Sequence, residues 1–174
     1  ANSRGISLIG DLPVFVSADS ADVWANRRLF QIDEDGRQRC HAGVPPDYFS
    51  PEGQDWGNPL YDWDALKATG YDWWIRRLDQ CRKRYDYVRM DHFRSFSEYY
   101  AIPEGGTPAE GRWQKGPGVD FYNAVADKLG GPDGVKIIAE DLGQLDIGVY
   151  NLLKLTGLPG MNVWQFSYDA MRDM

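Results

Sequence analysis

Four short apolar runs stand out along the chain, and helix-like patterns lie between them. The runs are ISLIGDLPVFV (6–16), YDYVRM (85–90), VKIIAE (135–140) and MNVWQF (161–166). Apolar residues at helical spacing predict helices over roughly 64–84, around 121–129 and around 149–153, and Gly130 and Gly157 end the last two. This order predicts three successive βαβ units, and therefore a parallel sheet covered by helices.

Two architectures fit that order, an open doubly wound sheet and part of a (β/α)8 barrel. Long irregular loops follow the first two strands, whereas the returns from helix to strand are short, and a barrel enzyme elaborates the same edge. A whole barrel needs about 250 residues, but only four strands are visible in 174 residues. We therefore expect an α/β chain of the (β/α)8 TIM-barrel type that forms a central four-strand part of the barrel. It would be one unit over 1–174, with a long insertion after its first strand and an aromatic substrate loop at 43–63.

Composition narrows the classes of function. The chain is 43% apolar with a net charge of −7, which is typical of a folded protein and argues against nucleic-acid binding. No apolar run is long enough for a transmembrane helix, and no leader is visible. Cys40 and Cys81 lack metal-type spacing, and we expect reduced thiols in a cytoplasmic protein without a metal or cofactor. Aromatic residues reach 14%, several of them in Gly/Pro-rich stretches, which suits sugar rings as ligands.

Carboxylates mark the ends of three of the four predicted strands. Asp11 lies near the end of the first strand, Asp91 closes the second and Glu140 closes the third, whereas the fourth ends in Gln165–Phe166. An acid at one strand end needs no function, because it can mark where the strand surfaces or cap the next helix. Three together, at the edge where parallel-sheet enzymes carry out their chemistry, favour a functional site.

The spacing of these acids indicates how each could act. Arg89 and Asp91 are two positions apart on a strand, so they point to the same side, and a neighbouring guanidinium favours the ionised carboxylate that a nucleophile or charge stabiliser needs. A structural Arg–Asp pair is the alternative. Glu140 follows three apolar residues, which raise the pKa of a carboxyl and favour a proton donor. Strands about 4.8 Å apart allow the two carboxylates the roughly 5–5.5 Å of a retaining glycosidase pair.

Four segments resemble one enzyme family, the 4-α-glucanotransferases called amylomaltases or disproportionating enzymes (glycoside hydrolase family 77). The matching segments are IGDLPVFVSADSADVWA, GVPPDYFSPEGQDWGNPLYDW, YVRMDHFRSF and KIIAEDLG. They occur in the family's order across nearly the whole chain. The resemblance implies a (β/α)8 barrel of the α-amylase clan and a retaining, double-displacement transfer of α-1,4-glucan segments between maltodextrins.

The resemblance also implies roles for individual residues. Asp91 matches the nucleophile, Glu140 the acid that then acts as base, and Arg89 the arginine that orients the nucleophile. Asp11 and His92 match positions that line the donor-sugar pocket. The residues that match the family's mobile loop over the donor and acceptor sugars are Tyr48, Phe49, Gln54, Trp56 and Asn58. The alternative for that loop is a structural plug of Pro, Gly and aromatic residues.

The chain departs from the family pattern at two points. Ser95 stands where the family has glycine, which we interpret as a surface-loop change of small effect. The family's third catalytic carboxylate belongs to a His–Asp pair on a later strand, and His41 and His92, the two histidines of this chain, are not in that context. We therefore expect a central fragment of the enzyme that is inactive by itself, with open barrel edges through which it could self-associate.

Two further hypotheses stay open at the level of sequence. The chain could be a noncatalytic carbohydrate-binding or structural piece, or belong to a hydrolase of the α-amylase clan, because the clan shares the catalytic acids. An unrelated βαβ binder of phosphate or nucleotide would need a Gly-rich loop between strand and helix, and the sequence has none.

Overall fold

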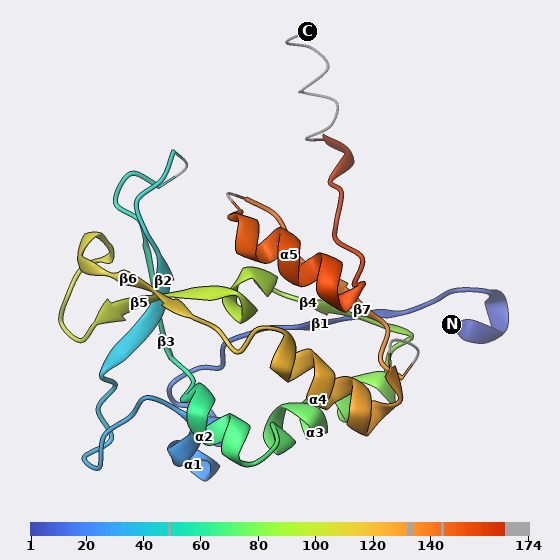
Figure 1. Cartoon of the computed structure of the whole chain (residues 1–174), viewed down its shortest axis with the longest axis horizontal. Coiled ribbons are helices and arrows are strands. Elements are labelled where there is room, and N and C mark those ends of the chain that lie inside the picture. Colours follow the sequence, from blue (N-terminus) through green and yellow to red (C-terminus); the bar gives the residue numbers. More distant parts are fainter. Residues whose placement is uncertain (49, 132–133, 144, 166–174) are drawn as a thin grey trace, which may run out of the picture.

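Two β-sheets organise the chain, of which the computed structural model describes residues 1–48, 50–131, 134–143 and 145–165. The first sheet is parallel, with strand order β1–β4–β7, and the second is antiparallel, with order β3–β2–β5–β6. The antiparallel sheet lies beyond the carboxyl ends of the parallel strands (Figure 1). The strands are β1 (Ile9–Leu12), β2 (Cys40–Val44), β3 (Gln54–Pro59), β4 (Tyr87–Met90), β5 (Glu98–Pro103), β6 (Arg112–Lys115) and β7 (Ile137–Ala139). The α-helices are α1 (Ala21–Ala25), α2 (Trp63–Ala68), α3 (Asp72–Arg82), α4 (Val119–Leu129) and α5 (Ile147–Thr156).

The two faces of the parallel sheet differ in burial. Val88 and Met90 of β4 are buried, whereas Tyr87 is exposed and Arg89 is partly exposed. The neighbouring strands continue this alternation, because Leu12 pairs in register with Met90. One face is therefore packed, and among the described residues the other face is largely open. The prediction of a parallel sheet built from the first three apolar runs is confirmed.

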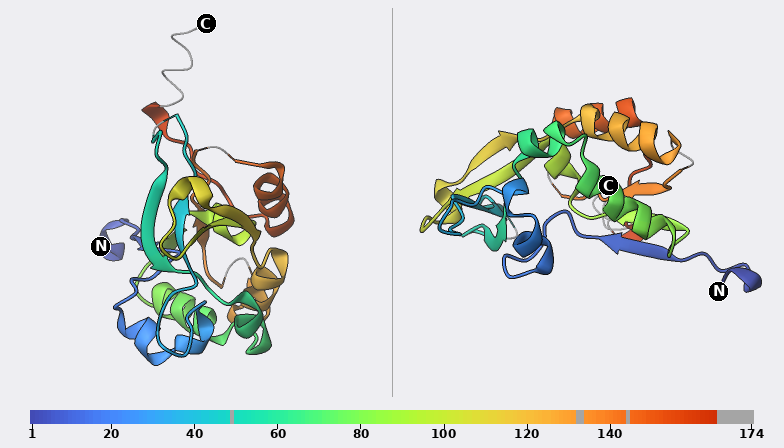
Figure 2. Two further views of the ribbon diagram at one scale, coloured as in Figure 1. Left: turned by 90° about the vertical axis from the view of Figure 1, so that its left-hand side faces the viewer. Right: turned by 90° about the horizontal axis from the view of Figure 1, so that it is seen from below.

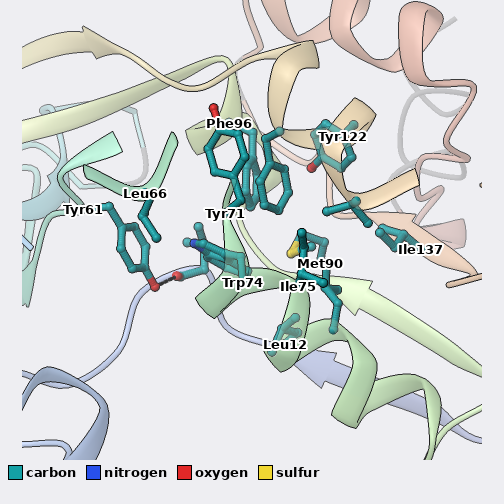
Figure 3. Close-up of a cluster of buried hydrophobic side chains, with 14 of the residues drawn as sticks. Leu12, Tyr61, Leu66, Tyr71, Trp74, Ile75, Met90, Phe96, Tyr122 and Ile137 are labelled. Atoms are coloured by element: carbon teal, nitrogen blue, oxygen red, sulfur yellow. Dashed lines mark hydrogen bonds between the residues drawn. The ribbon is translucent and has the colours of Figure 1, made fainter. Parts of the chain in front are cut away.

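The packed face of the sheet lies against α3, α4 and α5. Figure 3 shows Leu12, Met90 and Ile137 from the strands meeting Trp74 of α3 and Tyr122 of α4. Figure 2 gives two further views of these helices beside the sheet. These side chains belong to the main core of the protein, in which each large apolar residue removed from water contributes about 1.5–3 kcal/mol.

Local signals explain where several helices begin and end. Asp62 and Asp146 accept hydrogen bonds from backbone N–H groups in the first turns of α2 and α5. Gly130 and Gly157 adopt left-handed backbone conformations and end α4 and α5, as predicted. Glycine is also required at Gly10 in β1, because a Cβ atom there would overlap the ring of Tyr85.

Two predicted elements differ from the structure. The single helix predicted over 64–84 is two helices, because Gly70 and Tyr71 have positive φ angles and turn the chain between α2 and α3. The predicted fourth strand is wrong in its described part, residues 161–165. Residues 161–163 have no regular secondary structure and residues 164–165 are helical, and the backbone N–H of Met161 donates to the Asp141 carboxylate. Phe166 lies outside the described residues.

The loops expected after the first two strands contain the second sheet. The long insertion after β1 holds α1, β2 and β3, and the stretch after β4 holds β5 and β6. The segment 43–63, predicted as an aromatic loop, includes all of β3, which pairs antiparallel with β2. This segment is therefore largely part of a β-hairpin and not an irregular loop. Its strand was missed because QDWGNP has no apolar–polar alternation, and it forms only because β2 pairs with it.

Ser95 corrects another expectation. It is buried, with 1% of its surface exposed, in the 3-10 helix Phe93–Phe96 that follows β4. The departure from glycine at this position is therefore a change in the core and not in a surface loop. Within the described residues, no helix combines the length and the apolar character needed to cross a membrane.

Candidate active site

The register of the parallel sheet brings the predicted carboxylates to one edge. Asp11 pairs with Arg89, and Arg89 pairs with Ile138, on one rung across β1, β4 and β7. Asp91 and Glu140 each lie two residues further along their own strands, so they leave the sheet at the same height. A backbone hydrogen bond between the two strand ends supports this placement: the N–H of Glu140 donates to the carbonyl of Met90 (3.0 Å).

Arg89 links two of the acids. Its guanidinium donates through Nη1 to Asp11 (2.7 Å) and through Nη2 to Asp91 (2.9 Å). The two-residue spacing of Arg89 and Asp91 predicted that they share a side of the sheet, and the ion pair confirms it. The partner Asp11 is 78 residues away in sequence, so only the pairing of β1 with β4 reveals this second contact.

His92 turns the chain at the end of β4. It has φ 48° and ψ 50°, a left-handed conformation that is uncommon for a residue with a side chain. In this conformation its backbone N–H donates to Oε2 of Glu140 (2.8 Å), while Leu142 N–H donates to Oε1 (3.1 Å). The backbone strain at His92 is thus used to orient the carboxylate that closes the neighbouring strand.

The environment of Glu140 favours its protonated form. Burial raises the pKa of this carboxyl above its ordinary value, and the charge of Asp91 acts in the same direction. The N–H donors of Leu142 and His92 act against this shift, as does Arg89, and they do not reverse it. The predicted rise in the pKa of Glu140 is confirmed, and it matches the property that a proton donor requires.

The imidazole of His92 is held neutral near pH 7. Burial lowers its pKa to about 4, and the positive charge of Arg94 adds to the effect. Its ring also packs edge-to-face with Trp56 of β3, with ring centroids 4.9 Å apart. His92 therefore joins the carboxyl end of β4 to the antiparallel sheet through a neutral aromatic contact.

A cleft opens where the two sheets meet. Its lining residues are Pro13, Val14, Phe15, Trp56, Asn58, Asp91, His92 and Glu140. The amide of Asn58 donates to the carbonyl of Val16 (2.9 Å), and the indole N–H of Trp56 donates to Gln54 (3.0 Å). The two catalytic candidates thus face an aromatic and amide-bearing wall, a combination that suits the apolar faces and hydroxyl groups of sugars.

The remaining predicted site residues that the structure describes do not line the catalytic cleft. Asp11 and Arg89 form an ion pair on the sheet and line neither cleft, and Gln54 lines an adjoining cleft. Tyr48 lines neither cleft, and 89% of its surface is exposed. Phe49 lies outside the described residues. No group of three metal-ligating side chains occurs in the described ranges.

Several residues that line the clefts were not identified from sequence, among them Phe15, Trp113 and Asp146. Phe15 lines the catalytic cleft, and Trp113 and Asp146 line the adjoining one. Phe15 lies inside the predicted run 6–16, whereas the observed strand β1 ends at Leu12, and a residue after a strand end is a usable signal in a parallel sheet. Trp113 lies on β6, in the antiparallel sheet that the apolar pattern did not indicate.

Comparison with known proteins identifies the family. The family model described as 4-alpha-glucanotransferase matches residues 1–174. The chain belongs to the 4-α-glucanotransferase family. Two relatives of that name, from Streptococcus pneumoniae and Synechocystis sp., are each 49% identical, over 170 and 174 residues, and these matches cover 97% and 99% of this chain.

A solved structure supports the same assignment to the 4-α-glucanotransferases. Amylomaltase from Streptococcus agalactiae in complex with acarbose aligns over 95% of this chain with a TM-score of 0.89 and 46% identity. The chain covers 33% and 34% of the lengths of the two curated relatives and 33% of this amylomaltase. It therefore spans about a third of the length of the relatives that it matches. The recognised family is confirmed.

Proposed function

We propose that the protein containing this chain is a retaining glycosyltransferase that moves α-1,4-glucan segments from one maltodextrin to another. The observation that carries the proposal is the cleft shared by Asp91 and Glu140, which an aromatic wall flanks. Membership of the 4-α-glucanotransferase family supports it. α-Glucans are accordingly the class of substrate that we assign.

The proposed reaction has two displacements. In the first, an oxygen of Asp91 attacks the anomeric carbon, the glycosidic bond breaks, and Glu140 donates its proton to the leaving oxygen. In the second, Glu140 takes the proton of an acceptor hydroxyl, whose oxygen attacks the anomeric carbon and releases Asp91. Two inversions retain the α configuration. The raised pKa of Glu140 supports the first role.

Neighbouring residues support these two acids. The ion pair with Arg89 fixes the orientation of Asp91, and Asp11 holds the second edge of that guanidinium. His92, Trp56 and Asn58 line the cleft and are assigned to the sugar site. The residues assigned to the outer part of the glucan path are Tyr48, Phe49 and Gln54.

The chain is proposed to form a central part of a (β/α)8 barrel. Helices α3, α4 and α5 belong to one core with the packed face of the parallel sheet, whereas an open doubly wound sheet carries helices on both faces. The other face presents Ile9, 61% exposed, and Tyr87. Because parallel sheets are normally covered on both faces, further strands facing this side would complete the fold.

Product analysis tests the proposed function. The full-length protein incubated with maltotriose is expected to give glucose together with a ladder of longer maltodextrins, because each transfer lengthens one chain and shortens another. Chromatography of the products follows the ladder. Short sugars alone would show a hydrolase, and no conversion of any α-glucan would contradict the assignment.

A further inference from the structure

A second cleft adjoins the catalytic cleft. Trp56 and His92 line both clefts and so form the boundary between them. On the far side of this pair, Arg94 and Trp113 line the second cleft, together with residues 44–47. A glucan chain that exceeds the catalytic cleft can therefore continue past Trp56 into this second space.

The strand order indicates on which side of the cleaved glycosidic bond the second cleft lies. Strand β4, which carries Asp91, lies between β1 and β7. Pro13, Val14 and Phe15, which directly follow β1, line the catalytic cleft alone, whereas Leu142, Gly143 and Asp146, which follow β7, line the second cleft alone. A proton donor stands beside the leaving group, and the acceptor later occupies the same place. With Glu140 as that donor, the second cleft lies on the leaving-group and acceptor side.

Arg94 is a charged group of this cleft that contacts two other lining residues. Its guanidinium carbon lies 3.9 Å from the centroid of the Trp113 ring, and Nη2 donates to Oδ2 of Asp146 (3.2 Å). The other carboxylate oxygen of Asp146 accepts the N–H of Val149 (3.1 Å) and caps α5. Trp113 is itself braced edge-to-face by Tyr100, with centroids 5.0 Å apart. Three separate elements thus fix one planar cation.

The side chains of Arg94, Asp146 and Trp113 are only partly buried. Only 16% of the Arg94 side chain is exposed, compared with 34% for Asp146, and the Trp113 residue is 37% exposed. An ion pair withdrawn from water contributes little net stability, because desolvation offsets the attraction between the charges. A cation, a carboxylate and an indole that all border a cleft do, however, match a sugar ring, which offers hydroxyl donors, hydroxyl acceptors and an apolar face.

We propose that Arg94, Asp146 and Trp113 form an acceptor-binding wall that holds a glucose unit of the leaving and incoming glucan. This inference rests on the proposed function, and it assigns these residues to the choice between sugar and water as acceptor. Arg94 acts as a preorganised planar donor. A lysine at this position keeps the charge but loses both the fork of N–H groups and the flat stacking on Trp113.

The test separates the two half-reactions in the full-length protein. An α-maltosyl fluoride donor has no sugar as leaving group, so the initial burst of fluoride, before the glycosyl ester of Asp91 is cleaved, reports the first half-reaction. Adding maltose then reports the acceptor step. For Arg94→Lys and for Trp113→Ala, the KM for maltose is expected to rise about tenfold and to change more than fluoride release. The ratio of transfer to hydrolysis is expected to fall.

Arg77→Lys is the matched control. Arg77 on α3 also stacks on indole rings, at 4.9 Å from Trp74 and 5.1 Å from Trp73, and it lines neither of the two clefts. Its substitution should leave the KM for maltose unchanged. An unchanged KM in Arg94→Lys and Trp113→Ala, with transfer by the unmodified protein intact, would overturn this inference alone. Equal losses in fluoride release and transfer would also overturn it, as a general structural effect.

Discussion

The two sheets of this protein contribute different kinds of residue to the two adjoining clefts. The parallel sheet carries Asp91 and Glu140 at its strand ends, where backbone register and the ion pair with Arg89 set their positions. The antiparallel sheet carries Trp56 and Trp113, whose rings contact His92 and Arg94.

The two sheets also differ in how firmly they are packed. The core of the parallel sheet includes residues from five α-helices, whereas the cluster of buried residues under the antiparallel sheet consists of Ala42, Leu60, Tyr99 and Ala101. On the proposed function, chemistry that needs fixed charges would take place on the more heavily packed sheet, and recognition of the sugar chain would depend on the less packed one. Substitutions in the first should change mainly kcat, and substitutions in the second mainly KM.

The largest expected effect is that of Asp91→Asn in the full-length protein. The amide cannot form the glycosyl ester, so kcat for maltotriose is expected to fall by about 10⁴-fold or more, as for other lost nucleophiles. Glucan binding, measured by calorimetry, should persist because the aromatic wall is intact. Near-normal turnover would remove Asp91 from the role of nucleophile.

Glu140→Gln should have the next largest effect. Loss of the acid is expected to lower kcat by about 10²–10⁴-fold with maltotriose, and by less with an α-maltosyl fluoride donor, whose leaving group needs little protonation. The first half-reaction of the unmodified protein should slow as the pH rises through the raised pKa of Glu140, because the proton is then lost. The variant should lack this alkaline decline. Equal losses with both donors would contradict the assignment.

Trp56→Ala probes the antiparallel sheet. Loss of the indole is expected to raise KM for maltotriose about 5- to 10-fold, which corresponds to about 1–1.4 kcal/mol of aromatic contact. The change in kcat should be smaller, since the register of Asp91 and Glu140 does not involve β3. Trp56→Phe should restore part of the affinity. A loss confined to kcat would show that the division of roles between the sheets is wrong.

The smallest expected effect concerns stability. His92 has a folded-state pKa of about 4 against about 6.5 when unfolded. The stabilisation from the neutral ring is therefore complete above the unfolded pKa and is lost as the pH falls toward 4. The free energy of unfolding should decrease by about 2 kcal/mol at most between pH 7 and pH 5, and by less where solvent screens the ring.

His92→Asn tests this dependence on pH. Asparagine tolerates the left-handed backbone of His92 better than most residues. Denaturant titrations of both full-length proteins at pH 7 and pH 5 should show a smaller pH effect in the variant. An identical decrease in both proteins would assign the acid sensitivity to other groups.

Local sequence signals were sufficient for the parallel sheet. Alternating apolar residues in β4 predict which face is packed, and glycines predict where α4 and α5 end. They were insufficient for β3 and β6, whose sequences QDWGNP and RWQK carry no alternation. Such strands form because a partner strand satisfies their backbone groups, which is a property of the fold and not of the segment.

The sequence by itself determined the family, the carboxylates at the strand ends, and the shared direction of Arg89 and Asp91. These depend on short motifs and on the two-residue period of a strand. Only the tertiary structure decided that Asp11 holds the second edge of Arg89, that the backbone of His92 orients Glu140, and that Trp113 faces Arg94. Each of these contacts joins different elements, so it depends on strand register and sheet packing that no local pattern specifies.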